Sequence, residues 1–569
     1  MIIHHINIRD AAILGLIALI GFILFLGAPP LFDWDEINFA EAAREMIVSG
    51  NYLQVQINYE PFYEKPPLFF WLQVLSMKIF GVNEFAARFP NAIIGVFTVL
   101  ALYFNGLYFR DRFFGYILSG FYLGTMLPVI YFKTGIIDPT FNFFIFLGLM
   151  QILRFDFLHQ RDREKARKDS GPWGAGFWIG VATLTKGPVA LLVTGFIYLI
   201  YKIIFDRSRF PWLAIFTFLI AWVIVVAGWY GIETVVHGPS FIHSFITYQL
   251  ELFNQNVAGH EQPFYYHFFV FLLGCFPMSA FVFRGMFLRT GIEQERMVRR
   301  FMIVWFWVVL ILFSIVRTKI VHYSSLLYFP GAFLAADFFY ELKKGNQTVK
   351  WDSYVLLALG IIVWGILPTS INYAQTHLPE IIDLIKDPFT KANLTAEIEW
   401  SGFEWMIGAF FLAGILVNLF LLIRKKWNMY LYLQVALTIF FVNAQFKVTV
   451  PKVAQYTQGA PLEFFSGLAG KDVYILISGY KSYLPYFYAK VLPPENENSN
   501  DYQWLAQGEI DKDVYLVVKE HKINDTFKKR FRNFEELYRS AGFVFFVRKS
   551  NAILRANNSI KQKAFAGGS

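Results

Sequence analysis

The sequence contains little cysteine and few charged side chains. Cys275 is the only cysteine among 569 residues, which excludes an internal disulfide framework and says little about the redox compartment. Charged residues make up only 16% of the chain, whereas soluble globular proteins carry roughly 25%. Hydrophobic residues reach 56% and lie in blocks, many of which approach the roughly 20 helical residues that cross a hydrocarbon core. Most blocks have no polar face, so an integral membrane protein is predicted rather than a soluble helical one.

Apolar runs alternate with charged interruptions in a pattern that predicts about 13 membrane-spanning helices. The first run follows a short polar start and lacks a small-residue cleavage site, so we expect a retained anchor rather than a signal peptide. The spans are expected at approximately Ala11–Ala28, Phe89–Phe109, Phe113–Tyr131, Ile137–Phe155, Trp173–Leu184, Val189–Phe205, Trp212–Gly231, Phe264–Phe283, Phe301–Val316, Tyr323–Tyr340, Tyr354–Leu367, Phe403–Ile423 and Met429–Phe446.

The loops between these spans fall into a basic set and a set with few basic residues. The basic set holds Arg110, Arg112, Arg161–Lys168, Lys202, Arg207, Arg209, Arg284–Arg300, Lys343, Lys344, Lys350 and Arg424–Lys426. By the positive-inside rule the basic loops are cytoplasmic. The N-terminus is then inside, and the loops 29–88, 232–263 and 370–401 and the C-terminal region are outside. The net charge of +9 therefore comes mostly from the basic cytoplasmic loops that set the orientation in the membrane, and no nucleic-acid partner is predicted.

The C-terminal region changes composition and reads as a small soluble domain. From about Lys447 it is polar and mixed. Short strands are predicted at Val473–Ile477, Val514–Val518 and Phe543–Val547, and helices at Tyr483–Lys490 and Phe531–Ser540. We therefore expect an all-α polytopic membrane domain over residues 1–446, with a large outer loop at 29–88. A periplasmic α/β domain over 447–555 and a disordered tail over 556–569 would follow.

Ionisable residues in or beside membrane helices are costly and mark functional sites by default. Six of them fall at the outer ends of the predicted spans, namely Lys133, Asp138, Lys186, Arg317, Lys319 and His322. Any one of them could simply lie in the wet interface. Their coincidence on one face, beside the large outer loop, predicts a site at that boundary.

The first outer loop opens with Asp33-Trp34-Asp35-Glu36, which begins a predicted amphipathic helix. Its apolar face includes Phe39, and such a helix is expected to lie along the membrane surface. An alternative is that the acidic residues only cap the helix, with Glu36 completing a capping box that Asp33 begins.

Further along the same loop, the sequence Glu64-Lys65-Pro66-Pro67-Leu68 places a lysine before paired prolines. The prolines stiffen the turn and keep Lys65 extended. A lysine held at the interface beside an apolar segment suits a lipid phosphate. The alternative is a lysine that only snorkels to the interface.

Together these segments resemble the 4-amino-4-deoxy-L-arabinose transferases (ArnT-like), C-type glycosyltransferases with the GT-C fold that are related to protein O-mannosyltransferases. The resemblance covers roughly the first 340 residues. It is carried by Asp35-Glu36, Ala43-Arg44-Glu45-Met46, Tyr63–Leu68, Phe85–Pro90, Asp138, Leu184–Pro188, and Lys319–Tyr323 followed by Pro330.

The resemblance implies an enzyme of the bacterial inner membrane that moves a sugar from a polyprenyl (undecaprenyl) phosphate carrier to lipid A, another glycolipid or a protein, with inversion. It implies roles for residues of this chain. Asp35 and Asp138 would be catalytic, and Lys65, Lys186 and Arg88 would bind the donor phosphate. Tyr63, Lys319 and Tyr323 would line the substrate pocket, and Glu64 and His260 could ligate a divalent metal. One departure is Asn38, where relatives often carry arginine.

The role of Asp35 depends on the acceptor. A hydroxyl acceptor must lose a proton, so Asp35 would act as general base, whereas a phosphate acceptor is already ionised. His260 is a lone loop histidine, a type that is more often merely exposed. A transporter for a lipid-linked sugar is disfavoured because the charges lie on one face and no internal repeat is present. A structural subunit with a degenerate site is disfavoured because the acid and lysine candidates are all present.

Overall fold

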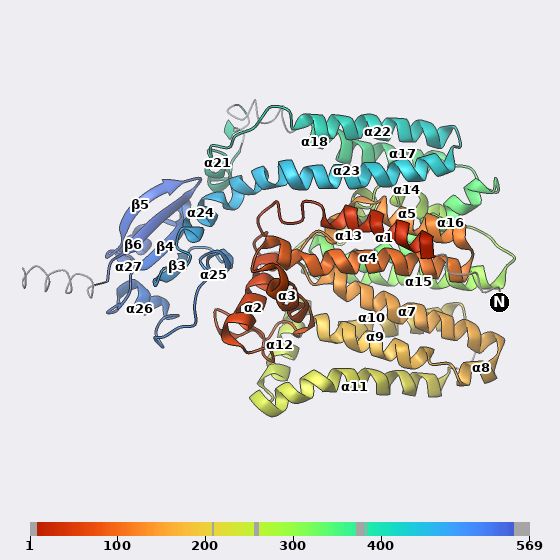
Figure 1. Cartoon of the computed structure of the whole chain (residues 1–569), viewed down its shortest axis with the longest axis horizontal. Helices are drawn as coiled ribbons and strands as arrows, with labels where there is room; N and C mark the ends of the chain where they lie inside the picture. The colour runs from red at the N-terminus through yellow and green to blue at the C-terminus, as the bar shows by residue number, and fades with distance from the viewer. Residues whose placement is uncertain are drawn as a thin grey trace, which may run out of the picture.

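The computed structural model describes residues 8–206, 210–254, 261–370, 380, 382–383 and 385–550. In this part of the chain most helices run side by side in one bundle, and a sheet lies beyond one end of it (Figure 1). We call this end of the bundle the sheet end. The helices α2, α3 and α12 lie at the sheet end, whereas α8 lies at the opposite end.

The helices of the first half follow the chain with short connections. They are α1 (Ile8–Ile23), α2 (Asp35–Ser49), α3 (Leu68–Phe80), α4 (Glu84–Phe109), α5 (Arg112–Leu123), α6 (Met126–Tyr131), α7 (Asp138–Arg161), α8 (Arg163–Arg167), α9 (Gly171–Lys186), α10 (Val189–Ile204), α11 (Trp212–His237) and α12 (Ser240–Asn254). A two-stranded hairpin of β1 (Gln56–Ile57) and β2 (Glu60–Pro61) precedes α3.

The second half continues the bundle and then leaves it. Its helices are α13 (Tyr266–Gly274), α14 (Ser279–Met286), α15 (Glu293–Ile315), η2 (Val321–Leu327), α16 (Tyr328–Lys343), α17 (Trp351–Ile361), η3 (Ile362–Ile366), α18 (Leu367–Thr369), α21 (Pro388–Asn393), α22 (Trp405–Ile423), α23 (Trp427–Ala454), η4 (Gln455–Gly459), α24 (Ala460–Ser466), α25 (Leu484–Tyr488), α26 (Tyr502–Gln507), η5 (Glu520–Lys522) and α27 (Asp525–Arg530).

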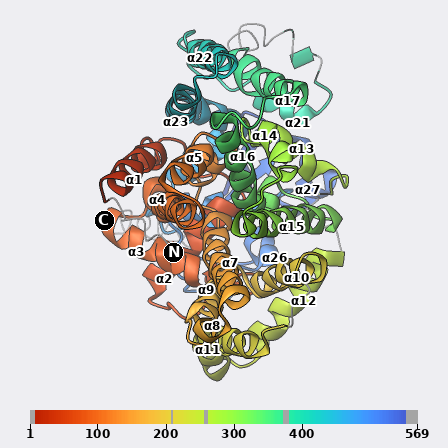
Figure 2. The same ribbon diagram turned by 90° about the vertical axis from the view of Figure 1, so that its right-hand side faces the viewer.

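Seven helices of the described chain are long and apolar enough to cross a membrane, and an eighth span is possible if the bent pair α13–α14 is one span. Each of the 13 segments predicted from hydropathy overlaps at least one helix. Several of them are short or broken, and α13–α14 is bent by 109°. A mostly helical, multi-pass membrane protein is therefore confirmed. The predicted number of 13 spans is not, because only seven or eight helices of the described chain are long and apolar enough to span a membrane. Seen along the bundle, α17, α22 and α23 group on one side and α8 to α12 on the other (Figure 2).

The helix predicted to lie on the membrane surface is instead enclosed. Every residue of α2 from Glu36 to Met46 is buried. The capping alternative is also wrong, because α2 begins after Trp34 without a side-chain cap. Asp33 accepts a hydrogen bond from the backbone N–H of Tyr483, at 3.2 Å, in the C-terminal region. The start of α2 is thus attached to a segment far away in the sequence.

The C-terminal sheet contains four strands in the order β3-β4-β6-β5. They are β3 (Tyr474–Ser478), β4 (Val514–Lys519), β5 (Glu535–Ser540) and β6 (Phe543–Arg548). β3 and β4 are parallel, and the other two pairs are antiparallel. One face packs on α26 and α27 through residues such as Leu516, and Phe464 of α24 packs on Phe545 of the other face. The helix that enters this region runs unbroken from Trp427 to Ser466, through the domain boundary predicted at residue 447.

The three predicted strands are present, but the helix predicted over Phe531–Ser540 is wrong. Residues Glu535–Ser540 form the edge strand β5, which pairs with β6. All six of its side chains are exposed, so no alternating pattern marks it in the sequence. The turn between β5 and β6 uses Ala541 and Gly542, both with positive φ. Alanine is a poor marker for such a turn, which Asn-Gly or Asp-Gly would have indicated. The tail over 556–569 lies outside the described residues.

At the opposite end of the bundle, one arginine joins helices that are distant in sequence. The Arg110 guanidinium contacts Glu295 of α15 at 2.9 Å, and Asp337 and Glu341 of α16 at 2.5 Å each. Arg299 adds a second contact to Asp337 at 2.6 Å. If the cation that the three carboxylates share is removed, the carboxylates repel one another.

We therefore expect Arg110→Ala to lower the free energy of unfolding by about 3–5 kcal/mol, the cost of breaking a buried ion pair. Thermal unfolding of the detergent-purified protein measures this effect. Arg296→Ala is the control, because Arg296 is exposed and makes no ion pair within the described chain. Equal stability of the two variants contradicts the assigned role of Arg110.

Candidate active site

A cavity of about 700 Å³ opens at the sheet end of the bundle. Its volume lies within the roughly 300–1,000 Å³ that is usual for small-molecule sites. The wall is drawn from α2, α7, α9, α10, α12, α15, η2 and the loop before α3, and its ionisable groups include Asp35, Glu64, Lys65, Asp138, Lys186, His322, Tyr323 and Lys481. We call it the charged cavity.

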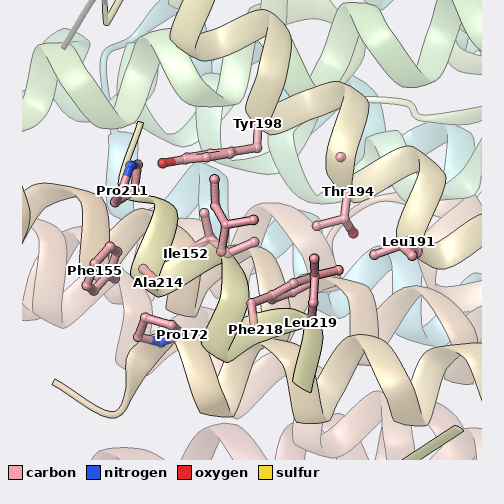
Figure 3. Close-up of a pocket in the computed structure, with 12 residues that line it drawn as sticks. Ile152, Phe155, Pro172, Leu191, Thr194, Tyr198, Pro211, Ala214, Phe218 and Leu219 are labelled. Carbon is pink, nitrogen blue, oxygen red and sulfur yellow. The ribbon is translucent and has the colours of Figure 1, made fainter. Parts of the chain in front are cut away.

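A second cavity, of about 210 Å³, differs in chemistry. It lies between α7, α9, α10 and α11 (Figure 3). Its wall is formed by Ile152, Phe155, Phe218 and other apolar side chains, and it contains no carboxylate, lysine or histidine. Only Thr194 and Tyr198 bring polar side-chain atoms to it. Such a cavity can hold an apolar chain but offers no acid, base or strong electrophile.

Asp138 and Lys186 form an ion pair in the charged cavity. Asp138 is the first residue of α7, and Lys186 is the last residue of the neighbouring helix α9. Lys186 Nζ donates to Asp138 Oδ1 at 2.7 Å, and the same ammonium lies 4.8 Å from the centre of the Tyr323 ring. Gly187 follows the last residue of α9 and has a φ of 102°. A Cβ atom at this position would lie 2.5 Å from the Phe245 ring, so glycine is required there.

His322 lies between the two predicted catalytic carboxylates. Its Nε2 atom is 3.8 Å from Asp35 Oδ2 and 3.7 Å from Asp138 Oδ2. Burial lowers the pKa of the His322 imidazole. The Asp138 and Asp35 carboxylates raise this pKa, whereas the Lys186 and Lys65 ammonium groups lower it further. The imidazole is thus close to both acids, slightly beyond the length of a direct hydrogen bond.

Lys65 enters the cavity from the stiff turn before α3. Its Nζ is 3.7 Å from a Glu64 carboxylate oxygen and 5.3 Å from the centre of the Tyr248 ring. Burial lowers the pKa of Lys65, and the nearby Lys186 ammonium lowers it further, while Glu64 opposes the shift. Two ammonium groups that disfavour each other's charge would both be stabilised by an anion placed between them.

A buried ion pair positions the start of α2. Arg88 of α4 donates to both oxygens of Glu36 at 2.8 Å. The Gly135 N–H donates to Glu36 Oε1 at 2.5 Å, three residues before Asp138. Because Glu36 follows Asp35 directly, this one carboxylate connects the segments that hold Asp35 and Asp138.

The predicted role of Arg88 in phosphate binding is therefore not supported by its position. Its side chain is fully buried and lies outside the cavity wall. Besides Glu36, it donates to the carbonyl oxygens of Leu26, Pro29 and Pro30 at 2.7–3.0 Å. These bonds use all five N–H groups of a guanidinium, so none remains for a ligand.

Other predicted residues also lie away from the charged cavity. The Tyr63 ring packs on Phe241, 5.9 Å between centroids, in an apolar cluster. Lys319 is buried but absent from the wall, although its neighbours Thr318 and Ile320 belong to it. Of the six charges predicted at the outer helix ends, Asp138, Lys186 and His322 meet here, whereas the exposed Arg317 does not.

Lys133 has a structural role at the end of α1. Its ammonium donates to the carbonyl oxygens of Phe22 and Leu24 at 3.3 and 2.7 Å, and to Asn443 at 2.9 Å. It thus satisfies carbonyls that the helix end leaves without partners.

The predicted metal ligands remain a prediction. Glu64 lines the cavity, but His260 lies outside the described residues. Among the residues that are described, no group of three His, Cys, Asp or Glu side chains gathers in a metal-binding arrangement.

Several cavity residues were not predicted as part of the site, and three of them carry polar groups from unexpected places. Tyr248 lies on a helix that carries no motif, and Asn38 attracted attention only as a departure from relatives. Asn38 is 3% exposed, and its Oδ1 has no hydrogen-bond partner in the described chain. Lys481 comes from the C-terminal region, where nothing distinguishes it from other surface lysines. Only the tertiary structure brings them to the cavity.

Sequence comparison finds that this chain is similar to known transferases. Residues 64–229 match the family model for dolichyl-phosphate-mannose-protein mannosyltransferases. An undecaprenyl phosphate-alpha-4-amino-4-deoxy-L-arabinose arabinosyl transferase of Enterobacter sp. is 28% identical over 392 residues, 65% of this chain and 68% of that relative. The corresponding protein of Wigglesworthia glossinidia brevipalpis is 26% identical over 354 residues, 60% of this chain and 62% of its own length.

Among solved structures, ArnT from Cupriavidus metallidurans bound to undecaprenyl phosphate superposes with a TM-score of 0.73. The superposition covers 95% of this chain and 98% of that one, at 17% sequence identity. The predicted resemblance is confirmed. This chain is similar in sequence to the arabinosyl transferases and shares the fold of ArnT over nearly its whole length. Its match to the mannosyltransferase model covers the segment that holds Glu64, Lys65, Asp138 and Lys186.

We expect Arg88→Ala to destabilise the protein by about 3–5 kcal/mol, because it leaves the Glu36 carboxylate buried and unpaired. Thermal unfolding in detergent measures the effect. Lys78→Ala is the control, since Lys78 is exposed on the neighbouring helix α3 and makes only a cation–π contact. A fully stable Arg88→Ala protein contradicts the structural role of this arginine.

The pKa of the His322 imidazole is expected below the ordinary histidine value of about 6.5. The Asp138 carboxylate raises this pKa, so Asp138→Asn should lower it further. NMR titration of the ¹⁵N-histidine-labelled protein, with His322→Gln to assign the signal, measures both values. A wild-type pKa above 6.5, or an increase in Asp138→Asn, contradicts the described surroundings of His322.

Proposed function

We propose that this protein is an integral membrane glycosyltransferase that moves a sugar from a polyprenyl-phosphate carrier to an envelope acceptor such as lipid A, inverting the anomeric carbon. The observation that carries the proposal is the meeting of two lysines with two carboxylates in one cavity at an end of the bundle. The names of the sequence relatives and the undecaprenyl phosphate bound in the solved ArnT of the same fold support this donor class.

Lys65 and Lys186 are assigned to the donor phosphate. When the bond between the sugar and its carrier breaks, negative charge grows on the departing phosphate. Two fixed ammonium groups stabilise that charge without reorganising. Loss of a preorganised group of this kind costs about 3–4 kcal/mol in the barrier, a factor of roughly 10²–10³ in rate.

The two carboxylates receive different roles because their partners differ. Asp138 accepts a short hydrogen bond from Lys186, so it orients that lysine and balances its charge. The Asp35 side chain is 36% exposed, and the His322 imidazole lies 3.8 Å from it. Because it is the more exposed of the two, we assign Asp35 to the acceptor, as general base for a hydroxyl or as an orienting group for a phosphate. Tyr323, over which the Lys186 ammonium lies, completes this side of the pocket.

The orientation follows from the basic loops. We assign the sheet end to the outer, periplasmic face of a bacterial inner membrane and the N-terminus to the cytoplasm. The membrane domain would include about 13 helices, several of them too short to span by length alone. The outer loop 29–88 and a periplasmic α/β domain up to residue 555 would form the water-exposed part of the enzyme.

A protein acceptor is the second candidate. The family model that matches residues 64–229 is named for enzymes that mannosylate proteins, which favours a Ser or Thr hydroxyl. With such an acceptor, Asp35 must remove a proton. A transporter for a lipid-linked sugar remains disfavoured, because the wall brings carboxylates and lysines together as a transferase requires. A divalent metal at Glu64 and His260 stays a prediction of the resemblance.

Asp35→Asn and Lys65→Ala should each reduce sugar transfer at least 10²-fold while the protein stays inserted in the membrane. Mass spectrometry of lipid A, glycolipids and envelope glycoproteins from cells with and without the protein identifies the sugar and the acceptor. The variants are then compared with the wild type in that assay. Lys78→Ala serves as the active control, because Lys78 lies outside the cavity wall. Normal transfer by Asp35→Asn removes the proposed role of Asp35.

A further inference from the structure

We propose that the cavity between α7, α9, α10 and α11 binds one acyl chain of an anionic phospholipid from the cytoplasmic leaflet of the membrane. This apolar cavity, as we call it, measures about 210 Å³ and shares no wall residue with the charged cavity. Such a lipid site goes beyond the proposed function, because it depends on the orientation of the bundle in the membrane and not on sugar transfer.

Water does not fill the apolar cavity. A buried water needs roughly two to four polar partners, and an apolar cavity of about 150 Å³ stays dry. Thr194 and Tyr198 carry the only polar side-chain atoms of the wall, and the Tyr198 hydroxyl already donates to Asp156 at 3.2 Å. Only the Thr194 hydroxyl, which has no partner among the described residues, remains for a water. An empty cavity forfeits packing contacts, so an apolar ligand is favoured there.

The apolar cavity opens toward the lipid between α10 and α11. Gly195 of α10 lines the cavity and is exposed, and a Cβ atom built on it meets no atom within 4 Å. Leu219 of α11 also lines the cavity and is 38% exposed. α11 is itself a lipid-facing helix, because only three of its 26 residues are buried. A chain of the surrounding bilayer can therefore enter sideways without crossing water.

One end of the apolar cavity lies at the level of the cytoplasmic membrane–water interface. Pro172 and Pro211 of the wall are each followed directly by an exposed tryptophan, Trp173 and Trp212. Tryptophan is enriched at membrane–water interfaces. Figure 3 shows the Tyr198 hydroxyl directed toward Pro211, at this same end. The part of a lipid next to its glycerol therefore belongs at this end, and the chain extends from it into the cavity.

Exposed cations lie beyond this end of the apolar cavity. α7 continues from Phe155 of the wall to Arg161, about 9 Å further toward the cytoplasmic end of the helix. Lys168 precedes Pro172 of the wall by four residues. Both cations are exposed, and neither forms an ion pair within the described part of the chain. Basic side chains on the cytoplasmic side attract anionic lipid headgroups, so an anionic phospholipid is favoured over a zwitterionic one.

The tail of the sugar carrier is less suited to this place, because packed side chains separate the two cavities. On α7 the charged cavity ends at Asn142 and the apolar cavity begins at Ile152, about 15 Å further along the helix. Between these levels Leu149 and Ile179 are fully buried, and a Cβ atom at Gly148 would lie 2.7 Å from Ile179. A tail attached to the donor phosphate therefore finds no passage through this interface.

A chain held in the apolar cavity supports the helix that carries one of the donor lysines. α9 packs against both α10 and α11, and its last residue is Lys186. The chain fills the gap that α10 and α11 leave beside α9, and so restores packing contacts that an empty cavity lacks. A ligand that binds only the folded protein also raises its stability by mass action.

The test is native mass spectrometry of the full-length protein in detergent. The probes are phosphatidylglycerol, phosphatidylcholine with the same acyl chains, and polyprenyl phosphate. We expect phosphatidylcholine to bind roughly tenfold more weakly than phosphatidylglycerol, and Arg161→Gln/Lys168→Gln to remove this preference. Gly195→Phe places a ring in the cavity and should weaken binding of phosphatidylglycerol roughly tenfold or more, while binding of polyprenyl phosphate stays unchanged.

Gly228→Phe is the matched control. Gly228 is exposed on α11 outside the cavity wall, and a Cβ atom there also meets no atom within 4 Å. The same ring on a lipid-facing surface should leave the dissociation constant of phosphatidylglycerol unchanged. Ala214→Leu fills the cavity from α11 and replaces Gly195→Phe if that variant does not fold. Its own control is Ala227→Leu, at an exposed position of the same helix.

Thermal unfolding gives an independent readout without sugar transfer. Phosphatidylglycerol should raise the Tm of the wild type and of Gly228→Phe, but not that of Gly195→Phe, whose cavity is already filled. Equal binding of phosphatidylglycerol by Gly195→Phe and Gly228→Phe, or equal affinity of the wild type for the two phospholipids, overturns the proposal. Loss of polyprenyl phosphate binding in Gly195→Phe also overturns it, because the cavity would then hold the tail of the carrier.

Discussion

The buried ion pair between Glu36 and Arg88 is the interaction on which the candidate active site depends. Glu36 joins α4, through Arg88, to the turn before α7, through the Gly135 N–H. Asp35 lies one residue before this carboxylate, and Asp138 lies three residues after Gly135. Removing two charges from water costs several kcal/mol per ion, and here the cost is offset by direct contact and by carbonyl partners for Arg88. The geometry of both catalytic candidates is thus set by residues that touch no substrate.

The charged cavity combines groups that would be unfavourable if any one of them were buried alone. Asp138 is stabilised by Lys186, and Glu64 lies beside Lys65. His322 separates Asp35 from Asp138, which would otherwise repel each other across a confined space. Lys186 also lowers the pKa of Lys65, and an anion bound near both ammonium groups would stabilise their charged forms.

Hydropathy predicted the mostly helical, multi-pass character correctly but not the number of spans, because length and the absence of a polar face are properties of each segment alone. The site was predicted in part. Motifs and helix ends indicated Asp35, Lys65, Asp138 and Lys186, which the fold brings to one cavity. The sequence could not tell which cations face the cavity: Arg88 and Lys133 lie near the same boundary but bind backbone carbonyls instead. That distinction depends on side-chain direction, which hydropathy does not contain.

Features that depend on long-range pairing were the ones missed. The edge strand β5 exists because β6 pairs with it, and its exposed side chains resemble those of a surface helix. Lys481 reaches the cavity because Tyr483 is bonded to Asp33, a contact across 450 residues. No local pattern encodes such a contact. The C-terminal region is therefore part of the site by geometry, although its sequence suggests only a separate small domain.

The most direct test of this account is a structure of the protein with polyprenyl phosphate bound. The account predicts the phosphate in the charged cavity, with its oxygen atoms within hydrogen-bond distance of both Lys65 and Lys186, and with Arg88 still bonded to Glu36. A phosphate bound at Arg88, or at any place out of reach of Lys65 and Lys186, would contradict it.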